Sequence, residues 1–89
     1  MGIRNEAMQY DVFPERLHLR RTDLPRNMNR FYEIVVQRDL FGAAVLSCEW
    51  GRIGSPGRVR QRVFVDEGQA VNALLDVARV KKGRGYRVL

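Results

Sequence analysis

The residues of this chain with the clearest capacity for chemistry are aromatic and basic, and they gather around the end of one predicted strand. They are Trp50 and Arg52, directly before a glycine-rich turn, and Arg58, Arg60 and Arg62 on the strand that returns from it. An exposed tryptophan can stack on a base or a sugar, and a guanidinium beside it can bind a phosphate. This combination is typical of a nucleic-acid-binding site.

A structural role for the same residues is the alternative, and composition and pattern alone favour it. Trp50 falls on the same predicted strand face as Leu46 and Cys48, where it could be buried. The three arginines could then do no more than solvate their strand. The choice between the two interpretations depends on whether Trp50 is exposed.

The sequence offers no template for catalysis, metal binding or a cofactor. Its single histidine, His18, falls on the polar face of a predicted strand, and Cys48 takes a mid-strand position typical of a small buried hydrophobe. One histidine and one cysteine cannot form a structural zinc site. The loop at residues 51–57 lacks the lysine and the following helix of a phosphate-cradling nucleotide loop. We therefore expect no enzymatic activity, no metal and no cofactor.

Length and charge narrow the function classes further. The 89 residues suffice for one domain, and 45% hydrophobic with 29% charged residues is typical of a folded globular protein. Sixteen basic and ten acidic side chains give a net charge of +6, most of it in residues 46–89. Fourteen of the basic residues are arginine, which favours bidentate binding of phosphate. The longest apolar run, residues 40–46, is too short to span a bilayer, so no membrane-spanning segment is expected.

The single cysteine and the start of the chain indicate the compartment. Cys48 has no partner for an internal disulfide, which favours a reducing environment. Residues 1–6 lack the apolar segment of a secretory signal peptide. We therefore expect a cytoplasmic protein, associated with the nucleoid if it binds DNA.

Alternating apolar and polar side chains predict four strands, at residues 15–21, 31–37, 43–50 and 58–65. Turn chemistry predicts a loop at residues 22–27 and a type II turn at residues 55–58, which contains Gly57. In the last strand three valines alternate with Arg58, Arg60 and Arg62. This alternation predicts a strand with a basic outer face.

One long helix is expected after the strands. Asp66 is its predicted N-cap, with Gln69 in a variant of the capping box, and the helix runs to about residue 82 with Gly83 as a left-handed C-terminus. Apolar residues recur along it at helical spacing, and residues 85–89 could add a last strand. This order predicts an α+β fold, an antiparallel sheet of four to five strands with the helix packed on one face.

A short segment is expected before the fold. Residues 1–13 show no periodicity and end before a proline, so we expect a loosely ordered lead-in, followed by a single domain at residues 14–89. Tyr10, Val12 and Phe13 are the side chains with which the lead-in could dock on the domain.

Residues 50–57 read Trp-Gly-Arg-Ile-Gly-Ser-Pro-Gly, and this run resembles the signature of the WGR domain. Further matches occur in the right order at residues 29–32, 40–42 and 82–86, and the helix holds Ala70 between them. The resemblance covers about residues 15–87. WGR domains occur in DNA-dependent poly(ADP-ribose) polymerases and in bacterial proteins, including short stand-alone chains that this one resembles.

The resemblance implies a non-catalytic module that binds DNA breaks and couples neighbouring domains. Trp50 would stack against the sugar of a nucleotide at a strand terminus, and Arg52 would contact the terminal backbone or a partner domain. Asn29 would lie beside the break, and Lys82 and Tyr86 would lie near the phosphate. The glycines of the loop would shape it rather than touch DNA.

Two functions therefore remain open. The first is binding of DNA ends or nicks through the Trp-Gly-Arg loop and the basic surface of Arg58, Arg60 and Arg62. The alternative is a protein-interaction module that docks onto a larger DNA-processing or regulatory partner, in which Phe41 and the lead-in would matter more than the arginines. RNA binding is a weaker interpretation, because the predicted sheet lacks the paired aromatic residues of the usual RNA-binding sheet. Val35 replaces a glutamine of some polymerases, so the polar network near the site differs.

Overall fold

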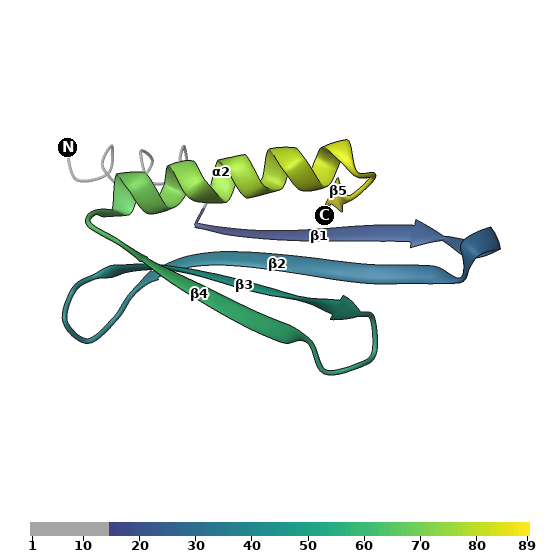
Figure 1. Cartoon of the computed structure of the whole chain (residues 1–89), viewed down its shortest axis with the longest axis horizontal. Helices are drawn as coiled ribbons and strands as arrows, with labels where there is room; N and C mark the ends of the chain where they lie inside the picture. The colour runs from purple at the N-terminus through teal and green to yellow at the C-terminus, as the bar shows by residue number, and fades with distance from the viewer. Residues whose placement is uncertain (1–14) are drawn as a thin grey trace, which may run out of the picture.

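The computed structural model describes residues 15–89, which form one sheet and one long helix (Figure 1). The elements in chain order are β1 (Arg16–Asp23), the 3₁₀ helix η1 (Leu24–Arg26), β2 (Met28–Arg38), β3 (Ala44–Arg52), β4 (Arg58–Phe64), α2 (Glu67–Gly83) and β5 (Arg87–Val88). The predicted lead-in at residues 1–13, and the docking of its Tyr10, Val12 and Phe13, lie outside the described residues.

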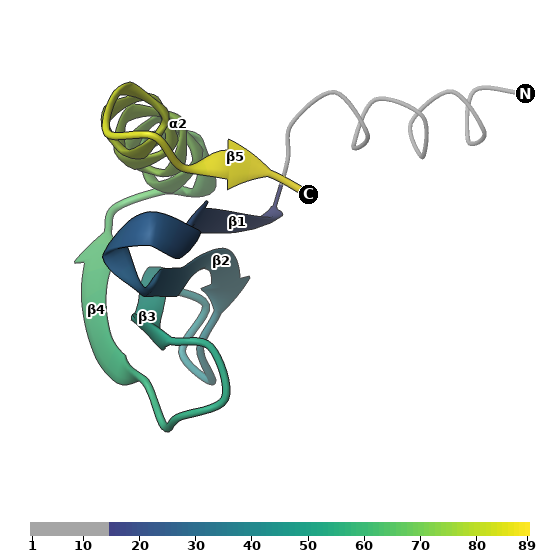
Figure 2. The same ribbon diagram turned by 90° about the vertical axis from the view of Figure 1, so that its right-hand side faces the viewer.

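The five strands form one antiparallel sheet in the spatial order β4-β3-β2-β1-β5. α2 lies along one side of this sheet, which we call the helix face; the other side is the open face (Figures 1 and 2). The predicted α+β fold, an antiparallel sheet with one helix packed on one face, is confirmed, and β5 is its fifth strand.

The hydrophobic core lies between α2 and the helix face. Its largest fully buried side chains, one each from β1, β2, β3 and α2, are Leu19, Ile34, Leu46 and Leu74. Strand alternation places every second side chain on the helix face, and the helical repeat places Ala70, Leu74 and Ala78 in one stripe. β4 contributes only the partly buried Phe64. The other helix-face side chains of β4 stay open to solvent at the sheet edge.

The hairpin of β1 and β2 is longer than predicted. The two strands stay paired as far as Asp23 opposite Met28, and only η1 and Asn27 connect them. Asn27 adopts a left-handed φ of 53°, and its N–H donates to the Leu24 carbonyl at 2.9 Å. The loop predicted at residues 22–27 is thus a tight turn, because cross-strand pairing extends the strands into their polar ends.

The turn between β3 and β4 also differs from its prediction. It lies at Arg52–Ser55, where the Ser55 N–H donates to the Arg52 carbonyl at 3.0 Å, and Gly54 carries the positive φ of 92°. Gly57 has no positive φ, so the type II turn predicted at residues 55–58 is wrong. Gly57 is required for another reason: a Cβ there would lie 2.9 Å from the Phe31 ring and 3.0 Å from the Trp50 carbonyl oxygen.

α2 ends within one residue of its prediction, but the left-handed glycine lies two residues later than predicted. Gly83 stays in the last helical turn, and Gly85 adopts the left-handed conformation with a φ of 99°. The N–H groups of Arg84 and Tyr86 both donate to the Lys81 carbonyl, at 2.9 and 3.0 Å. These bonds turn the chain back toward the sheet, which places Tyr86 against the core and β5 beside β1.

Asp66 caps α2 as predicted, because its Oδ1 accepts the N–H of Gln69 at 2.8 Å. Replacing Asp66 by alanine is expected to lower the free energy of unfolding by about 1 kcal/mol, since one N–H of the first helical turn loses its acceptor. Urea unfolding followed by circular dichroism measures the change. Asp66→Asn keeps an acceptor and serves as the control; an alanine variant as stable as the parent would show that this cap contributes nothing.

Candidate nucleic-acid interface

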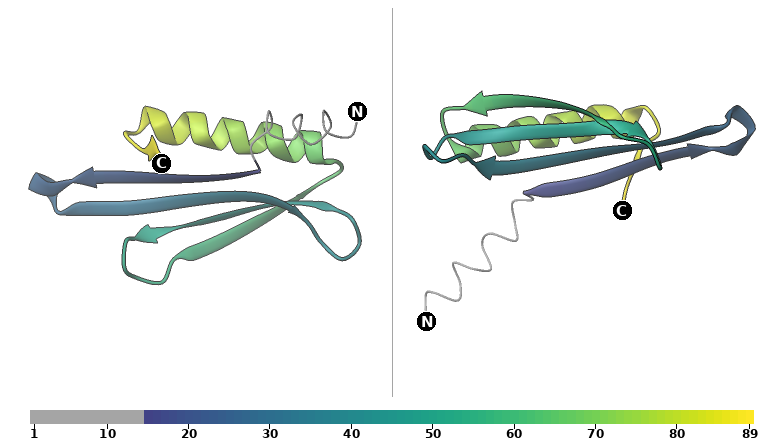
Figure 3. Two further views of the ribbon diagram at one scale, coloured as in Figure 1. Left: turned by 180° about the vertical axis from the view of Figure 1, so that it is seen from behind. Right: turned by 90° about the horizontal axis from the view of Figure 1, so that it is seen from below.

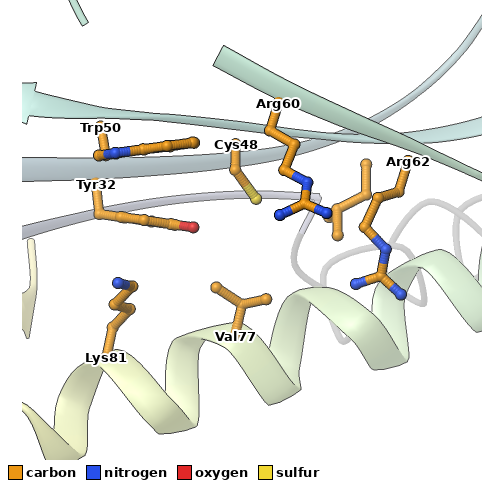
Figure 4. Close-up of a pocket in the computed structure, with 8 residues that line it drawn as sticks. Tyr32, Cys48, Trp50, Arg60, Arg62, Val77 and Lys81 are labelled. Atoms are coloured by element: carbon orange, nitrogen blue, oxygen red, sulfur yellow. The ribbon is translucent and has the colours of Figure 1, made fainter. Parts of the chain in front are cut away.

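Three aromatic side chains form a cluster on the helix face near the C-terminal end of α2. Trp50 of β3 stacks on Tyr32 of β2, with ring centroids 5.7 Å apart and planes 16° from parallel (Figure 4). Tyr86 meets Tyr32 edge-on, at 6.3 Å and 77°. Trp50 is half-buried, so the predicted alternatives of a fully exposed and a fully buried ring are both too simple. The stack holds the indole in a defined orientation.

A lysine from the helix joins this cluster. Lys81 Nζ lies 4.5 Å from the centroid of Tyr32 and 5.6 Å from that of Tyr86, within the range of cation–π attraction. Lys81 follows Leu74 by seven residues and Val77 by four, so the apolar stripe of α2 directs it at the sheet. Figure 4 shows its amine beneath the Tyr32 ring.

A cleft of about 420 Å³ extends from the cluster along the space between α2 and the edge of the sheet. The residues that line it are Tyr32, Leu46, Cys48, Trp50, Arg60, Arg62, Val77 and Lys81. Three of them are cationic, and none of these lining residues carries a carboxylate. Within residues 15–89, Arg60, Arg62 and Lys81 also form no ion pair with an acidic side chain. The cleft therefore has the electrostatics of an anion-binding site.

The position of the β4 arginines corrects the prediction of a basic outer face. Strand pairing sets Arg58 beside Trp50, Arg60 beside Cys48 and Arg62 beside Leu46, so all three arginines lie on the helix face. Alternation separates arginines from valines but does not say which set faces the helix. The arginines can take that face because β4 lies beyond the cover of α2. In Figure 4 the guanidinium groups of Arg60 and Arg62 point toward the helix.

Arg52 has a structural contact that its sequence position did not reveal. Its Nη1 donates to the Asn27 carbonyl at 3.0 Å, and its Nη2 donates to Asn27 Oδ1 at 3.2 Å. The guanidinium thereby joins the end of β3 to the tip of the β1–β2 hairpin. Arg52 remains exposed, and three of its five N–H donors stay available beyond these two bonds.

Two further predicted site residues lie apart from the cleft. Asn29 sits on the open face, opposite to Trp50, where its Oδ1 accepts from the Thr22 hydroxyl at 3.4 Å. Its carbonyl accepts the Ile53 N–H at 2.9 Å, so its backbone supports the Trp-Gly-Arg turn. Lys82 is exposed and does not line the cleft. The structure thus brings Trp50 together with Arg60 and Arg62 at the cleft and sets Arg58 beside Trp50. Tyr86 lies against Tyr32 and does not line the cleft, and Asn29 lies on the other side of the sheet.

Sequence reasoning missed Tyr32 and Lys81 as members of the site. Both carried a signal: Tyr32 shares its predicted strand face with Ile34, and Lys81 falls on the apolar stripe of the helix. A cation in an apolar stripe must point into the fold or snorkel to its edge. Here it reaches the aromatic rings at the margin of the core.

The cluster shifts the ionisation of two of its members. Burial raises the pKa of Tyr32 to about 12, and the Cys48 thiol and Tyr86 hydroxyl add to this effect, while Arg60 opposes it. Burial lowers the pKa of Lys81, and the neighbouring Arg84 cation adds to it. The phenol therefore stays neutral in ordinary buffers and can donate a hydrogen bond to an anion.

The raised pKa of Tyr32 predicts a late step in an alkaline titration. One of the three tyrosines should ionise near pH 12 in the folded protein, as followed by tyrosinate absorbance, and the step should vanish in Tyr32→Phe. Because the folded pKa exceeds the unfolded value, this contribution to stability is complete below pH 10 and is lost as the pH rises toward 12. A parent protein whose tyrosines all ionise near pH 10 would contradict the buried setting of Tyr32.

Comparison with known proteins gives one family and one curated relative. A family model described as WGR domain matches residues 15–89. A curated protein of Sinorhizobium fredii (strain NBRC 101917 / NGR234), described as uncharacterized protein y4dW, is 43% identical over 74 residues, which are 83% of this chain and 36% of the relative. The chain therefore spans about a third of the length of that relative. No solved structure matches the chain.

Residues 15–89 hold neither a candidate membrane-spanning helix nor a candidate metal site. Within residues 15–89, no helix has both the length and the apolar character needed to cross a membrane. In the same range, no three metal-ligating side chains come together as a group that could hold an ion.

Proposed function

The chain belongs to the WGR domain family, known as a nucleic-acid-binding module of poly(ADP-ribose) polymerase-like proteins, and from this premise we propose that it binds DNA ends or nicks without catalysing a reaction. The observation that carries the proposal is the cleft: Arg60, Arg62 and Lys81 face one space that no carboxylate lines, next to the stacked pair of Trp50 and Tyr32. Cations without acidic partners, beside an aromatic surface, suit a sugar–phosphate backbone.

The cations supply affinity that does not depend on sequence. Each guanidinium or ammonium group that neutralises a phosphate releases condensed counterions, which favours binding at low salt. Arg60 and Arg62 offer planar forks for phosphate oxygens, and Lys81 adds a point charge near Tyr32. Arg58 lies beside Trp50 on the same face, where it can contact a neighbouring phosphate. Lys82 is exposed in the last turn of α2 and can add to the positive electrostatic potential that attracts DNA.

Trp50 supplies the preference for a break. In a continuous duplex each base pair is stacked on both sides, whereas a terminus exposes one face of a nucleotide and a nick allows the stack to open and expose one. The Trp50 ring, oriented by Tyr32, is available to stack on that nucleotide. Arg52 holds the turn through Asn27, and Asn29 supports it through its carbonyl, so both act on Trp50 by positioning its hairpin.

Fluorescence anisotropy of two labelled hairpin DNAs tests the proposal. Both DNAs are closed by a loop at each end, so that neither has a free terminus; one carries a single 5′-phosphorylated nick and the other is intact, and each is titrated at several salt concentrations. The nicked hairpin should bind more tightly, with log affinity falling by about 0.9 per neutralised phosphate per decade of salt. Equal affinity for the two DNAs would overturn the preference for breaks. Affinity that does not respond to salt would overturn the role of the cationic cleft.

A second function is favoured by one specific feature, the turn between β2 and β3. Leu40 and Phe41 are 99% and 94% exposed at its tip. The turn is held in shape because Asp39 Oδ1 accepts the N–H groups of Phe41 and Ala43, each at 2.9 Å. A preorganised apolar tip suits insertion into a pocket of a larger protein partner. A pull-down that survives high salt and is lost in Phe41→Ser would support this function.

A further inference from the structure

The outer edge of β4 is the longest unpaired strand edge in the described chain. β4 is the last strand of the sheet on its side, and six of its seven residues are exposed. Figure 3 shows it at the margin, with α2 over the inner strands. On the other side of the sheet, β5 has only two residues and pairs with Leu19 and Arg20, which divides the outer edge of β1 into shorter unpaired stretches. A free edge presents N–H and C=O groups that can pair with a further strand.

The two faces of β4 differ sharply in chemistry. Arg58, Arg60 and Arg62 project on the helix face. Val59 and Val63 project on the open face and are 57% and 68% exposed. A strand paired to this edge would set its own alternate side chains beside arginines on one side and beside valines on the other.

A second copy of the chain fits this edge poorly. Antiparallel pairing of two β4 strands centred on Gln61 would set Arg60 of each copy beside Arg62 of the other. Like charges directly opposite each other destabilise a strand pair. A parallel pair in register would bring the same arginines together. The charge of β4 thus disfavours pairing with its own copy and favours an occupant of opposite sign.

We propose that the free edge of β4 accepts an extended acidic segment of a partner protein as a sixth strand, with carboxylates alternating with β-branched apolar residues. The carboxylates pair with Arg58, Arg60 and Arg62, the apolar residues cover Val59 and Val63, and main-chain hydrogen bonds supply the affinity. This surface goes beyond the proposed binding of DNA and does not rest on it, because the strand edge and the valines lie outside the cleft. It does share Arg60 and Arg62 with the cleft.

Binding of a labelled peptide with three Val-Glu repeats tests the proposal. A matched control has the same composition in block order, three valines followed by three glutamates. The alternating peptide should bind at least about tenfold more tightly, because only alternation puts all carboxylates on one face of a strand. Equal affinity of the two peptides, or no binding of the alternating peptide, would overturn the proposal.

N-methylation separates strand pairing from charge attraction. In an extended peptide the N–H groups of the glutamates point to one side and those of the valines to the other. Methylation of one set should abolish binding, and methylation of the other should leave it nearly unchanged. If both patterns have the same effect, the peptide does not bind as a strand and the proposal fails.

Two variants separate this surface from the DNA site. Val59→Thr/Val63→Thr keeps β-branched side chains and the strand, and should weaken the alternating peptide about threefold or more while nicked DNA binds unchanged. Trp50→Ala should weaken DNA and leave the peptide unchanged. If the parent protein binds the alternating peptide but shows no preference for nicked DNA, the proposed function fails and the β4 edge stands; an unchanged peptide affinity in the threonine variant would count against the β4 edge.

Discussion

Replacing Arg60 and Arg62 together by glutamate is expected to weaken the binding of nicked DNA by about a hundredfold or more. Each guanidinium lost removes a charge-assisted contact that contributes about 1.5 to 3 kcal/mol, and each new carboxylate repels the phosphates. The dependence of log affinity on log salt should also fall by roughly two units, since two phosphate contacts are lost. The same anisotropy titration of nicked and intact hairpins measures both effects.

A second double variant controls for net charge. Arg20→Glu/Arg79→Glu changes the charge of the protein by the same amount, but Arg20 lies on the open face and Arg79 is exposed on α2 and paired with Asp76. Its effect on DNA affinity should be several-fold smaller. If the two double variants lose affinity equally, DNA responds to the overall charge of the protein and the cleft is not the binding site.

The lysine pair Arg60→Lys/Arg62→Lys addresses geometry. It retains both charges and removes the planar forks, so an intermediate loss of affinity is expected if bidentate contacts matter. A full loss would indicate that the arginines also support the fold. Circular dichroism of the three double variants tests for such a loss of fold. We expect no change in the spectrum, because Arg60 and Arg62 are exposed and lie outside the buried core.

The fold could be predicted from the sequence because the patterns that mark strands and helix ends are local. Alternation marked four strands, and Asp66 with Gln69 marked the start of the helix, where the structure has the predicted hydrogen bond. These features depend on neighbours within a few residues. Strand ends were less accurate, since the length of the β1–β2 hairpin is set by pairing across Asp23 and Met28, which no local pattern encodes.

The site could be predicted only in part, because its geometry depends on long-range register. Alternation in β4 gave two sets of side chains, but only the pairing of Cys48 with Arg60 shows that the arginines share the face of Trp50. The same limit applies to Asn29. Only the pairing of Tyr32 with Trp50 shows that these two share the helix face, and Asn29, three residues before Tyr32 on the same strand, therefore projects on the open face. Lys81 was within reach of sequence reasoning, since its spacing already placed it on the apolar stripe of α2.

Replacing Trp50 by alanine is expected to weaken the binding of nicked DNA by about tenfold or more and to remove most of the preference over the intact hairpin. Stacking of a base or sugar on an aromatic ring contributes about 1 to 3 kcal/mol, and only a break offers an exposed nucleotide face for it. Binding to the intact hairpin should change little, because phosphate contacts of Arg60, Arg62 and Lys81 remain. The two anisotropy titrations, run side by side, give the change in preference directly.

Two further variants separate stacking from the support of the fold. Trp50→Phe keeps a ring against Tyr32 and should retain part of the preference, whereas Tyr32→Leu removes the ring that orients the indole and should lower the preference while Trp50 is intact. Because Trp50 is the single tryptophan of the chain, its emission also reports the contact: nicked DNA should quench it more than intact DNA. An alanine variant that still prefers the nick would place break recognition elsewhere, and equal quenching by both DNAs would show that the indole does not meet the terminal nucleotide.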